Sequence, residues 1–321
     1  IVEVRAAGLS TGLLTSSGEV YTFGCGMHGR IGHGKTMQNI TDPQKVLSIP
    51  KPCRSVSVGE NHVAAITVDG ELYTGGRQIH GSLGHGNKDK GHLQKVEGFD
   101  GKRVVSVACG TRHTVVATDD GSVYACGDGR TLALGQGTNK SAHKTPALVG
   151  DLAGVQVSEV HAGNGFSVAL TKDGSVYTWG SNEYGQLGRG RNDRYLPVGE
   201  VRFDKPVSRI SVGDFHVLAV TTDGAVYSFG NGGDGRTGLG NVENTTTPQQ
   251  VDELANHQVT HVAAGGAHSI AVTSNNEIFT WGKGRNGQLG QARGWCLLLV
   301  IFQVVLTHSM YLFPVLCRVT N

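Results

Sequence analysis

Residues 167–180 read Ser-Val-Ala-Leu-Thr-Lys-Asp-Gly-Ser-Val-Tyr-Thr-Trp-Gly. On either side of the Asp173-Gly174 pair lie short runs rich in β-branched, aromatic and other apolar residues, which are typical of strands. Asp-Gly pairs favour the two-residue type I′ turn, in which both central residues have positive φ. The stretch therefore predicts an antiparallel β-hairpin that ends at Gly180.

The end of this stretch, an aromatic residue followed by two variable residues and a glycine, recurs along the chain at intervals of 50 to 53 residues. Its six copies are YTFG ending at Gly24, YTGG at Gly76, YACG at Gly127, YTWG at Gly180, YSFG at Gly230 and FTWG at Gly282. A turn pair precedes each copy, and glycine-rich segments such as GSLGHG from Gly81 and GQLGRG from Gly185 follow. The chain is therefore predicted to contain six repeats of about 51 residues, each with three or four short strands.

A repeat of this size cannot bury both faces of its own sheet, so neighbouring repeats must cover each other. Closing the row into a ring also removes exposed sheet edges. We therefore expect an all-β fold, a β-propeller over residues 1–291, with a linear solenoid as the alternative. The 49 glycines suit the many tight turns that this architecture needs.

A second motif, a glycine followed three positions later by a histidine, precedes the hairpin in four repeats. The four pairs are Gly59 and His62, Gly110 and His113, Gly213 and His216, and Gly265 and His268. With the aromatic motif and the G-x-L-G segment, this pattern resembles the regulator of chromosome condensation repeat family. The resemblance implies a seven-bladed propeller, so that one blade is missing or incomplete, and a family whose members include nucleotide exchange factors, ubiquitin ligase domains, photoreceptors and scaffolds.

Two repeats depart from the histidine pattern. Thr11 follows Gly8 at the expected spacing, and Phe166 follows Gly163. Such replacements suit a packing residue better than a catalytic one. We therefore expect these histidines to pack or hydrogen-bond within their own repeat. The pairs His28 and His33, and His80 and His85, share one spacing and are interpreted as copies of one structural feature, not as metal sites.

Composition and short motifs give no sign of catalysis. The formal net charge is +2, which disfavours nucleic acid as the main ligand. The six cysteines form no C-x-x-C pair and are predicted to be buried thiols. The G-x-G-x-x-G match at Gly24 has no following helix, and Trp179 and Trp281 lie inside the repeat motif, not in a photoreceptor-like cluster. We therefore assign no catalytic residue, cofactor or metal ligand.

Charged connections offer the best candidates for partner binding. After the fourth repeat's GQLG segment the chain reads Arg189-Gly-Arg191-Asn-Asp193-Arg194. Arginine pairs well with carboxylates and phosphates, although an ordinary solvated loop is the alternative. The candidates are Arg189, Arg191, Asp193 and Arg194, with Lys88, Lys90, Lys140 and Lys144 in the equivalent connections of other repeats.

Residues 292–321 break the repeat. Residues 295–317 contain no Asp, Glu, Lys or Arg, which is the length and polarity of a membrane span. Gln303, His308 and Pro314 interrupt that run, so a divergent tail is favoured over an anchor.

Function follows from the fold more than from any motif. The sequence predicts an intracellular protein, cytoplasmic or nuclear, that binds a protein partner through a loop face of the propeller. One alternative is a guanine nucleotide exchange factor for a small GTPase. Another is a propeller module of a larger protein such as a ubiquitin ligase.

Overall fold

The computed structural model describes residues 1–290, except residues 35–37, 87–89, 100 and 138–139. These residues form two compact units. Unit 1 comprises Ile1–Lys172, Tyr177–Ser181 and Tyr195–Gly199, and unit 2 comprises Asp173–Val176, Asn182–Arg194 and the chain from Glu200 onward. The apolar tail of residues 292–321, with its possible membrane anchor at 295–317, lies outside the described residues.

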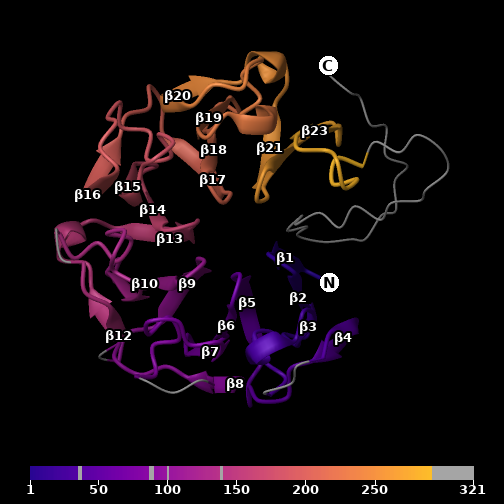
Figure 1. Cartoon of the computed structure of the whole chain (residues 1–321), viewed down its shortest axis with the longest axis vertical. Coiled ribbons are helices and arrows are strands. Elements are labelled where there is room, and N and C mark those ends of the chain that lie inside the picture. The colour runs from indigo at the N-terminus through magenta and orange to yellow at the C-terminus, as the bar shows by residue number, and fades with distance from the viewer. Residues whose placement is uncertain (35–37, 87–89, 100, 138–139, 291–321) are drawn as a thin grey trace. The chain divides into compact units, whose positions relative to one another are not determined.

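Unit 1 holds three complete four-stranded sheets and most of a fourth, numbered 1 to 4 in chain order (Figure 1). Sheet 1 contains β1 (Glu3–Ala7), β2 (Ser10–Leu14), β3 (Val20–Gly24) and β4 (Ile40–Lys45), and sheet 2 contains β5 (Cys53–Val58), β6 (His62–Thr67), β7 (Leu72–Gly76) and β8 (Lys90–Lys95). Sheet 3 contains β9 (Val104–Cys109), β10 (His113–Thr118), β11 (Val123–Gly127) and β12 (His143–Leu148), and sheet 4 contains β13 (Val157–Ala162), β14 (Phe166–Thr171), β15 (Val176–Ser181) and β16 (Tyr195–Val201).

Unit 2 holds sheets 5 and 6. Sheet 5 contains β17 (Val207–Val212), β18 (His216–Thr221), β19 (Val226–Gly230) and β20 (Thr245–Gln250), and sheet 6 contains β21 (Val259–Ala264), β22 (His268–Thr273) and β23 (Ile278–Gly282). Every sheet is an antiparallel meander whose strands are hydrogen-bonded in chain order, which is the construction of a propeller blade. The six predicted repeats are therefore confirmed as six sheets, of which the sixth has three strands among the described residues.

Helix is scarce, as the repeat predicts. The described residues contain four 3₁₀ helices of three residues each: η1 (Met27–Gly29), η2 (Gly150–Leu152), η3 (Gly233–Gly235) and η4 (Asp252–Leu254). Within the described part of the chain, none of these helices has the length or apolarity to cross a membrane.

The hairpin turns differ from the prediction in one respect. Gly70, Gly121, Gly174 and Gly224 all have positive φ, between 84° and 89°, but the aspartate before each does not. In sheet 2 the Gly70 amide donates to the Thr67 carbonyl at 3.0 Å, and the Thr67 amide donates to the Glu71 carbonyl at 2.9 Å. The loop therefore has three residues with a left-handed glycine at its end, and the predicted two-residue type I′ turn is wrong.

A threonine at the start of the turn explains this choice. The Thr118 hydroxyl donates to the Asp120 carboxylate at 2.7 Å, and the Thr221 hydroxyl donates to Asp223 at 2.6 Å. Such local bonds hold the aspartate in an ordinary right-handed turn. The glycine remains necessary, because a Cβ on Gly174 would lie 2.6 Å from the Cβ of Pro206.

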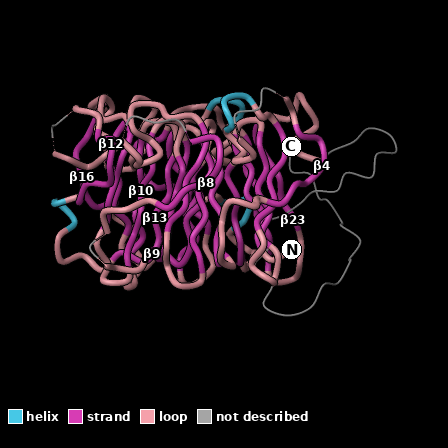
Figure 2. The backbone as a smooth tube through the Cα atoms, turned by 90° about the horizontal axis from the view of Figure 1, so that it is seen from below, coloured by secondary structure: helices cyan, strands magenta, loops and turns pink. Residues whose placement is uncertain are grey.

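Within each unit the core lies between successive sheets. Every residue of the second strands β6, β10 and β14 is buried, and apolar side chains of adjacent sheets form shared clusters, such as the one that joins Val115, Val160 and Trp179 in unit 1. Within each unit, the strands run between a set of loops at one end and a set of loops at the other (Figure 2). We call the end with the Asp-Gly turns the hairpin end, and the end with the turns after the first strands and the long loops after the third strands the loop end.

Candidate functional site

Three repeat histidines hydrogen-bond to the neighbouring sheet, so the prediction that they pack or hydrogen-bond within their own repeat is right for the packing of His113 and His216 against the motif glycine and wrong for the hydrogen bond. Nε2 of His62 lies 2.8 Å from the Thr114 hydroxyl, and Nε2 of His113 lies 2.9 Å from the Ser167 hydroxyl. In unit 2, Nε2 of His216 lies 2.8 Å from the Ser269 hydroxyl. In each pair the hydroxyl belongs to the next sheet in chain order, so these histidine–hydroxyl pairs are structural contacts between blades.

The hydrogen-bond partners fix the direction of each bond. The Ser167 hydroxyl donates its proton to the Ala133 carbonyl at 2.8 Å, so Nε2 of His113 must donate to Ser167. Thr114 donates in the same way to the Ser82 carbonyl at 2.7 Å. Both acceptor carbonyls lie in the long loop of the histidine's own sheet, and each pair therefore also fixes that loop.

Burial keeps these imidazoles neutral. Desolvation lowers the pKa of His62 to about 3, that of His113 to about 4 and that of His216 to about 3. The glycine of the motif has a steric role, because a Cβ on Gly110 would lie 2.4 Å from Cε1 of His113. The G-x-x-H motif is therefore a packing unit, and these histidines are not available for acid–base chemistry at neutral pH.

The strand register corrects one position in the sequence alignment. His62 lies opposite Gly76, and His113 lies opposite Gly127, whereas in sheet 1 the residue opposite Gly24 is Ser10. Ser10, not Thr11, therefore occupies the histidine position. The turn after Gly8 is one residue shorter than in the other repeats, which spacing from the glycine could not reveal.

The other histidine pairs are also structural. Nε2 of His33 lies 2.8 Å from the Thr22 hydroxyl, and Nε2 of His85 lies 2.9 Å from the Thr74 hydroxyl, so each bonds the third strand of its own sheet. His28 and His80 have φ of 59° and 51° and occupy turn positions. The interpretation of these pairs as copies of one feature is confirmed.

The four described cysteines and Trp179 are part of the core. Cys25, Cys53, Cys109 and Cys126 are buried free thiols, while Cys296 and Cys317 lie outside the described residues. Burial raises the pKa of Cys109 and of Cys126 to about 12, so both remain protonated thiols. The indole of Trp179, fully buried, donates to the Ala133 carbonyl at 2.8 Å.

The predicted arginine loop belongs to unit 2, and hydrogen bonds hold its backbone. The side-chain amide of buried Asn182 donates to the Arg191 carbonyl at 2.8 Å and to the Asp193 carbonyl at 3.1 Å. Its backbone amide donates to the Arg194 carbonyl at 2.8 Å. The Gly190 amide donates to the Thr246 carbonyl of β20 at 2.7 Å. The loop is therefore held in one shape before any partner arrives, through an asparagine that the sequence gave no reason to single out.

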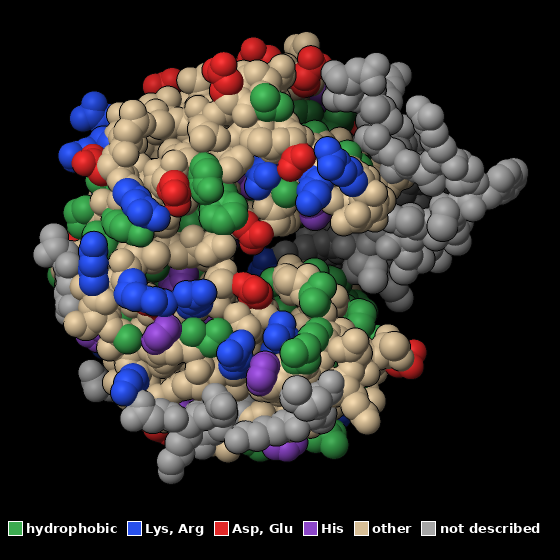
Figure 3. Space-filling view, in the orientation of Figure 1, with side chains coloured by type: hydrophobic (Ala, Val, Ile, Leu, Met, Phe, Trp, Pro, Cys, Tyr) green, Lys and Arg blue, Asp and Glu red, His purple; other side chains and the backbone are tan. Residues whose placement is uncertain are grey.

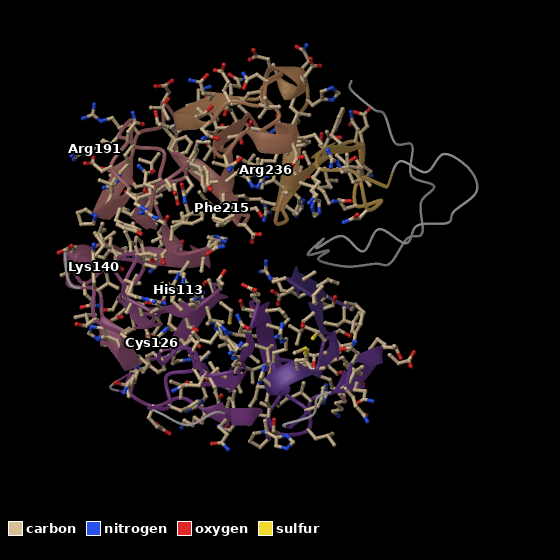
Figure 4. The ribbon with its side chains drawn as sticks, viewed as in Figure 1. His113, Cys126, Lys140, Arg191, Phe215 and Arg236 are labelled. Atoms are coloured by element: carbon tan, nitrogen blue, oxygen red, sulfur yellow. The ribbon has the colours of Figure 1, made fainter. Side chains whose placement is uncertain are left out.

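Its arginines differ in their surroundings. Arg191 is exposed and pairs with Asp193 at 2.9 Å, and Arg194 is exposed with Nη2 at 4.0 Å from the Glu183 carboxylate. Arg189 is half-buried, and desolvation lowers the pKa of its guanidinium. Arg191 lies at the outer rim of its unit, far from Phe215 and Arg236 (Figure 4).

The predicted lysines belong to unit 1, whereas the arginine loop belongs to unit 2. Lys88 and the side chain of Lys90 lie outside the described residues. Lys140 is exposed, with Nζ 5.0 Å from the centre of the Tyr195 ring, and Lys144 is exposed on β12. Their role in partner binding stays a prediction.

Sequence reasoning missed a charged cluster at the loop end of unit 1. Asp128, whose side chain is 8% exposed, accepts a hydrogen bond of 2.6 Å from Nη2 of Arg130. Nη1 of Arg112 lies 3.9 Å from the same carboxylate, and Nε2 of His80 lies 4.0 Å from it. Burial alone would raise the pKa of Asp128, but the bonds from Arg130 hold it below its usual value. Two guanidinium groups therefore share one carboxylate, and the cluster keeps a positive charge.

Other cations share this end of the unit. Arg77 follows β7 and is exposed, and it makes no ion pair within the described part of the chain. Figure 3 shows Lys and Arg side chains gathered over the sheets of unit 1, with few Asp and Glu side chains among them. The near-neutral composition therefore conceals a basic loop end.

The family of the chain is shown by comparison. The model of the RCC1-like domain family matches residues 1–296, which include every sheet described above. The chain therefore belongs to this family, whose members are β-propellers. The resemblance read from the glycine, histidine and aromatic motifs is confirmed.

Three curated relatives match most of this chain but different shares of their own lengths. The ultraviolet-B receptor UVR8 of Arabidopsis thaliana is 36% identical over 90% of this chain and 67% of the receptor. The human E3 ubiquitin-protein ligase HERC2 is 37% identical over 90% of this chain, which is 5% of the ligase. The human X-linked retinitis pigmentosa GTPase regulator is 39% identical over 87% of this chain and 26% of that protein. For the last two relatives, the chain matches only a module of a much larger protein.

One solved structure confirms the fold alone. Prp20p of Saccharomyces cerevisiae superposes with a TM-score of 0.79 at 23% identity, over 94% of this chain and 74% of Prp20p. That identity is too low to transfer a site, so the residues of this chain must carry any functional conclusion.

Proposed function

We propose that the chain is a protein-binding scaffold that docks an acidic surface of its partner on the loop end of unit 1. The observation that carries the proposal is the cluster around Asp128, in which Arg112 and Arg130 share a single buried carboxylate. The surplus charge on a rigid surface attracts carboxylates, and arginine can bind them in a bidentate manner. Cations at a rim act mainly on the association rate and on its salt dependence.

The family context supports a binding role. The matched segment occurs as a small part of the ligase HERC2, as expected of a module that recruits partners for activities located elsewhere in a chain. No motif in the sequence suggests chemistry, and the buried histidines and cysteines serve the packing of the blades. We place the protein inside the cell, because its buried thiols suit a reducing compartment.

A charge reversal at each end of unit 1 tests this proposal. Arg112→Glu changes the loop end, and Lys172→Glu makes the same change of charge at an exposed residue of the hairpin end. We expect Arg112→Glu to reduce co-purification of the partner by about tenfold and to flatten its salt dependence, while Lys172→Glu leaves both unchanged. Equal losses for the two variants, or none for Arg112→Glu, would sink the proposal.

A small GTPase is the more specific partner that we propose as a second candidate. One relative is named a GTPase regulator. The measurement is the rate of release of a fluorescent guanine nucleotide from purified small GTPases in the presence of the chain. Acceleration by the unaltered chain that is lost in Arg112→Glu would make exchange activity the function of the loop end, whereas unchanged release rates leave simple docking.

A further inference from the structure

A groove opens at the outer rim of unit 2, beside the arginine loop, and has a volume of about 470 Å³. The loop contributes Arg189 and Arg191, the end of β16 contributes Glu200, and the segment after β16 contributes residues 202–204. Tyr227 of β19 and Pro248 of β20 complete it. We call this feature the rim groove. It consists of residues of unit 2 alone, whereas the loop-end cluster belongs to unit 1, and nothing in the proposed function uses it.

Two aromatic rings form the apolar part of the rim groove. The rings of Phe203 and Tyr227 meet edge to face with centroids 5.8 Å apart, and both side chains are half-buried. Phe203 also contacts the fully buried Phe229, with ring centroids 6.4 Å apart. A Cβ on Gly188 would lie 2.8 Å from the Phe229 ring, so the loop backbone rests directly on this aromatic group. The rings are therefore fixed to the core and offer a rigid surface for an aromatic or aliphatic side chain.

The charges of the lining favour an anionic occupant. Arg189, Arg191 and Arg202 line the rim groove together with two carboxylates, Glu200 and Asp204. Arg202 is exposed and makes no ion pair among the residues that the structure describes. Arg189 stays protonated although burial lowers the pKa of its guanidinium, because an arginine pKa lies far above neutral pH. A partly desolvated cation attracts a carboxylate more strongly than an exposed one does.

The shape of the edge indicates how a ligand would bind. β20 is the edge strand of sheet 5, and Pro248 has no amide proton to offer to an added strand. Strand addition is therefore disfavoured here, and side chains must provide the contacts. The hydrogen bonds from Asn182 and Gly190 already fix the arginine loop, so little conformational entropy is lost on binding.

We propose that the rim groove binds a short acidic peptide segment of a partner protein, with one aromatic or aliphatic residue seated on Phe203 and Tyr227 and flanking carboxylates on Arg189 and Arg202. The occupant is thus a linear motif, in contrast to the folded acidic surface proposed for the loop end. The chain would then hold two partners, or two parts of one partner, at separate sites.

Fluorescent peptides titrated against the full chain test the proposal by anisotropy. The first peptide has a central phenylalanine flanked by glutamates, the second has alanine in place of phenylalanine, and the third has lysines in place of the glutamates. We expect the first to bind about tenfold more tightly than either of the others, since each of them lacks one of the two contacts. A proline-rich peptide is the fourth probe, because aromatic grooves also bind polyproline segments.

Variants assign the binding to the rim groove. Arg202→Glu should weaken the acidic peptide about tenfold, whereas Arg209→Glu, an exposed arginine of the same unit outside the groove, should change it less than about twofold. Phe203→Leu should weaken the peptides that carry the apolar anchor, and if it unfolds the chain the Arg202→Glu comparison still decides. Equal affinity for the acidic and basic peptides, preference for the proline-rich probe, or insensitivity to Arg202→Glu would each overturn the proposal. Arg112→Glu should leave peptide binding intact, so the two proposed sites can fail independently.

Discussion

Sheets 2 and 3 meet through a buried hydrogen bond between His62 and Thr114, whereas the same two positions at the junction of sheets 1 and 2 hold Ser10 and Val63. The Ser10 hydroxyl is buried and makes no hydrogen bond within the described residues. A histidine at the first position thus accompanies a hydroxyl at the second, in His62–Thr114, His113–Ser167 and His216–Ser269. The comparison teaches that each of these three buried imidazoles lies where a hydroxyl can accept its proton, and it predicts that removing that acceptor is costly.

The largest expected effect on stability comes from removing the hydroxyl of one histidine–hydroxyl pair. Ser167→Val leaves the buried Nε2–H of His113 without an acceptor and removes the bond to the Ala133 carbonyl. We expect a loss of about 2–3 kcal/mol in the free energy of unfolding, because an orphaned buried donor costs its full desolvation. Chemical denaturation followed by tryptophan fluorescence measures this loss, since Trp179 bonds the same carbonyl.

The matched control replaces both members of the pair with apolar residues. The double variant His113→Phe/Ser167→Val should lose less free energy of unfolding than the two single variants lose in sum, by about 1 kcal/mol or more. The reason is that neither buried polar group is then left without a hydrogen-bond partner. Additive losses would show that the two side chains do not act as a pair. Phe166 and Val217 occupy these two positions in the fourth and fifth repeats, so the chain already uses this combination of residue types.

The second expected effect is a dependence of stability on pH. The buried histidine–hydroxyl pairs contribute to it, whereas apolar residues at the same positions do not. Burial lowers the folded-state pKa of His62 and His216 to about 3 and that of His113 to about 4, against about 6.5 in the unfolded chain. Between pH 4 and pH 6.5 the unfolded state therefore binds more protons than the folded state. Stability is fully present above pH 6.5 and is lost as the pH falls through this window, by up to about 1.4 kcal/mol per pH unit for each histidine.

Thermal unfolding at half-unit steps from pH 7.5 to pH 4 measures this slope. The double variant His113→Phe/Ser167→Val should show a shallower slope than the unaltered chain, since one buried histidine is gone. The same slope in both chains would mean that His113 does not titrate differently in the folded and unfolded states.

The sequence was sufficient for the fold because the features that set it recur. Six aromatic motifs predicted six sheets, and the turn glycines Gly70, Gly121, Gly174 and Gly224 have the positive φ expected of them. The predicted turn type was wrong because it rested on the Asp-Gly pair alone, and the threonine that donates a hydrogen bond to the aspartate lies outside that pair. The prediction that Thr11 holds the histidine position was wrong because the turn after Gly8 is one residue shorter than in the other repeats, so that Ser10 holds it. Only the strand register shows which residues lie opposite each other.

The sites were less predictable, because they depend on contacts between segments that are distant in the sequence. The arginine loop was visible as a local cluster of charge, but its fixed shape depends on Asn182, and the aromatic floor beside it is built from Phe203 and Tyr227 of later segments. The cluster around Asp128 joins Arg112 and Arg130, from two different turns of the same repeat, with His80 from the preceding sheet. No local motif reports such a meeting.

The smallest expected effect on stability comes from removing the exposed arginines of the arginine loop. Arg191 and Arg194 are 64% and 67% exposed, and their partners Asp193 and Glu183 are each 52% exposed. Ion pairs of this kind contribute between zero and about 1 kcal/mol, so Arg191→Ala/Arg194→Ala should shift the free energy of unfolding by less than about 1 kcal/mol. Arg189 is kept because it is half-buried, and its removal would change the packing of the loop as well as its charge. If this double variant lost as much stability as Ser167→Val, the arginines would be part of the blade framework and their use for partner binding would have to be abandoned. A stability close to that of the unaltered chain would instead place structure in the repeated buried pairs and leave Arg191, which lines the rim groove, to recognition.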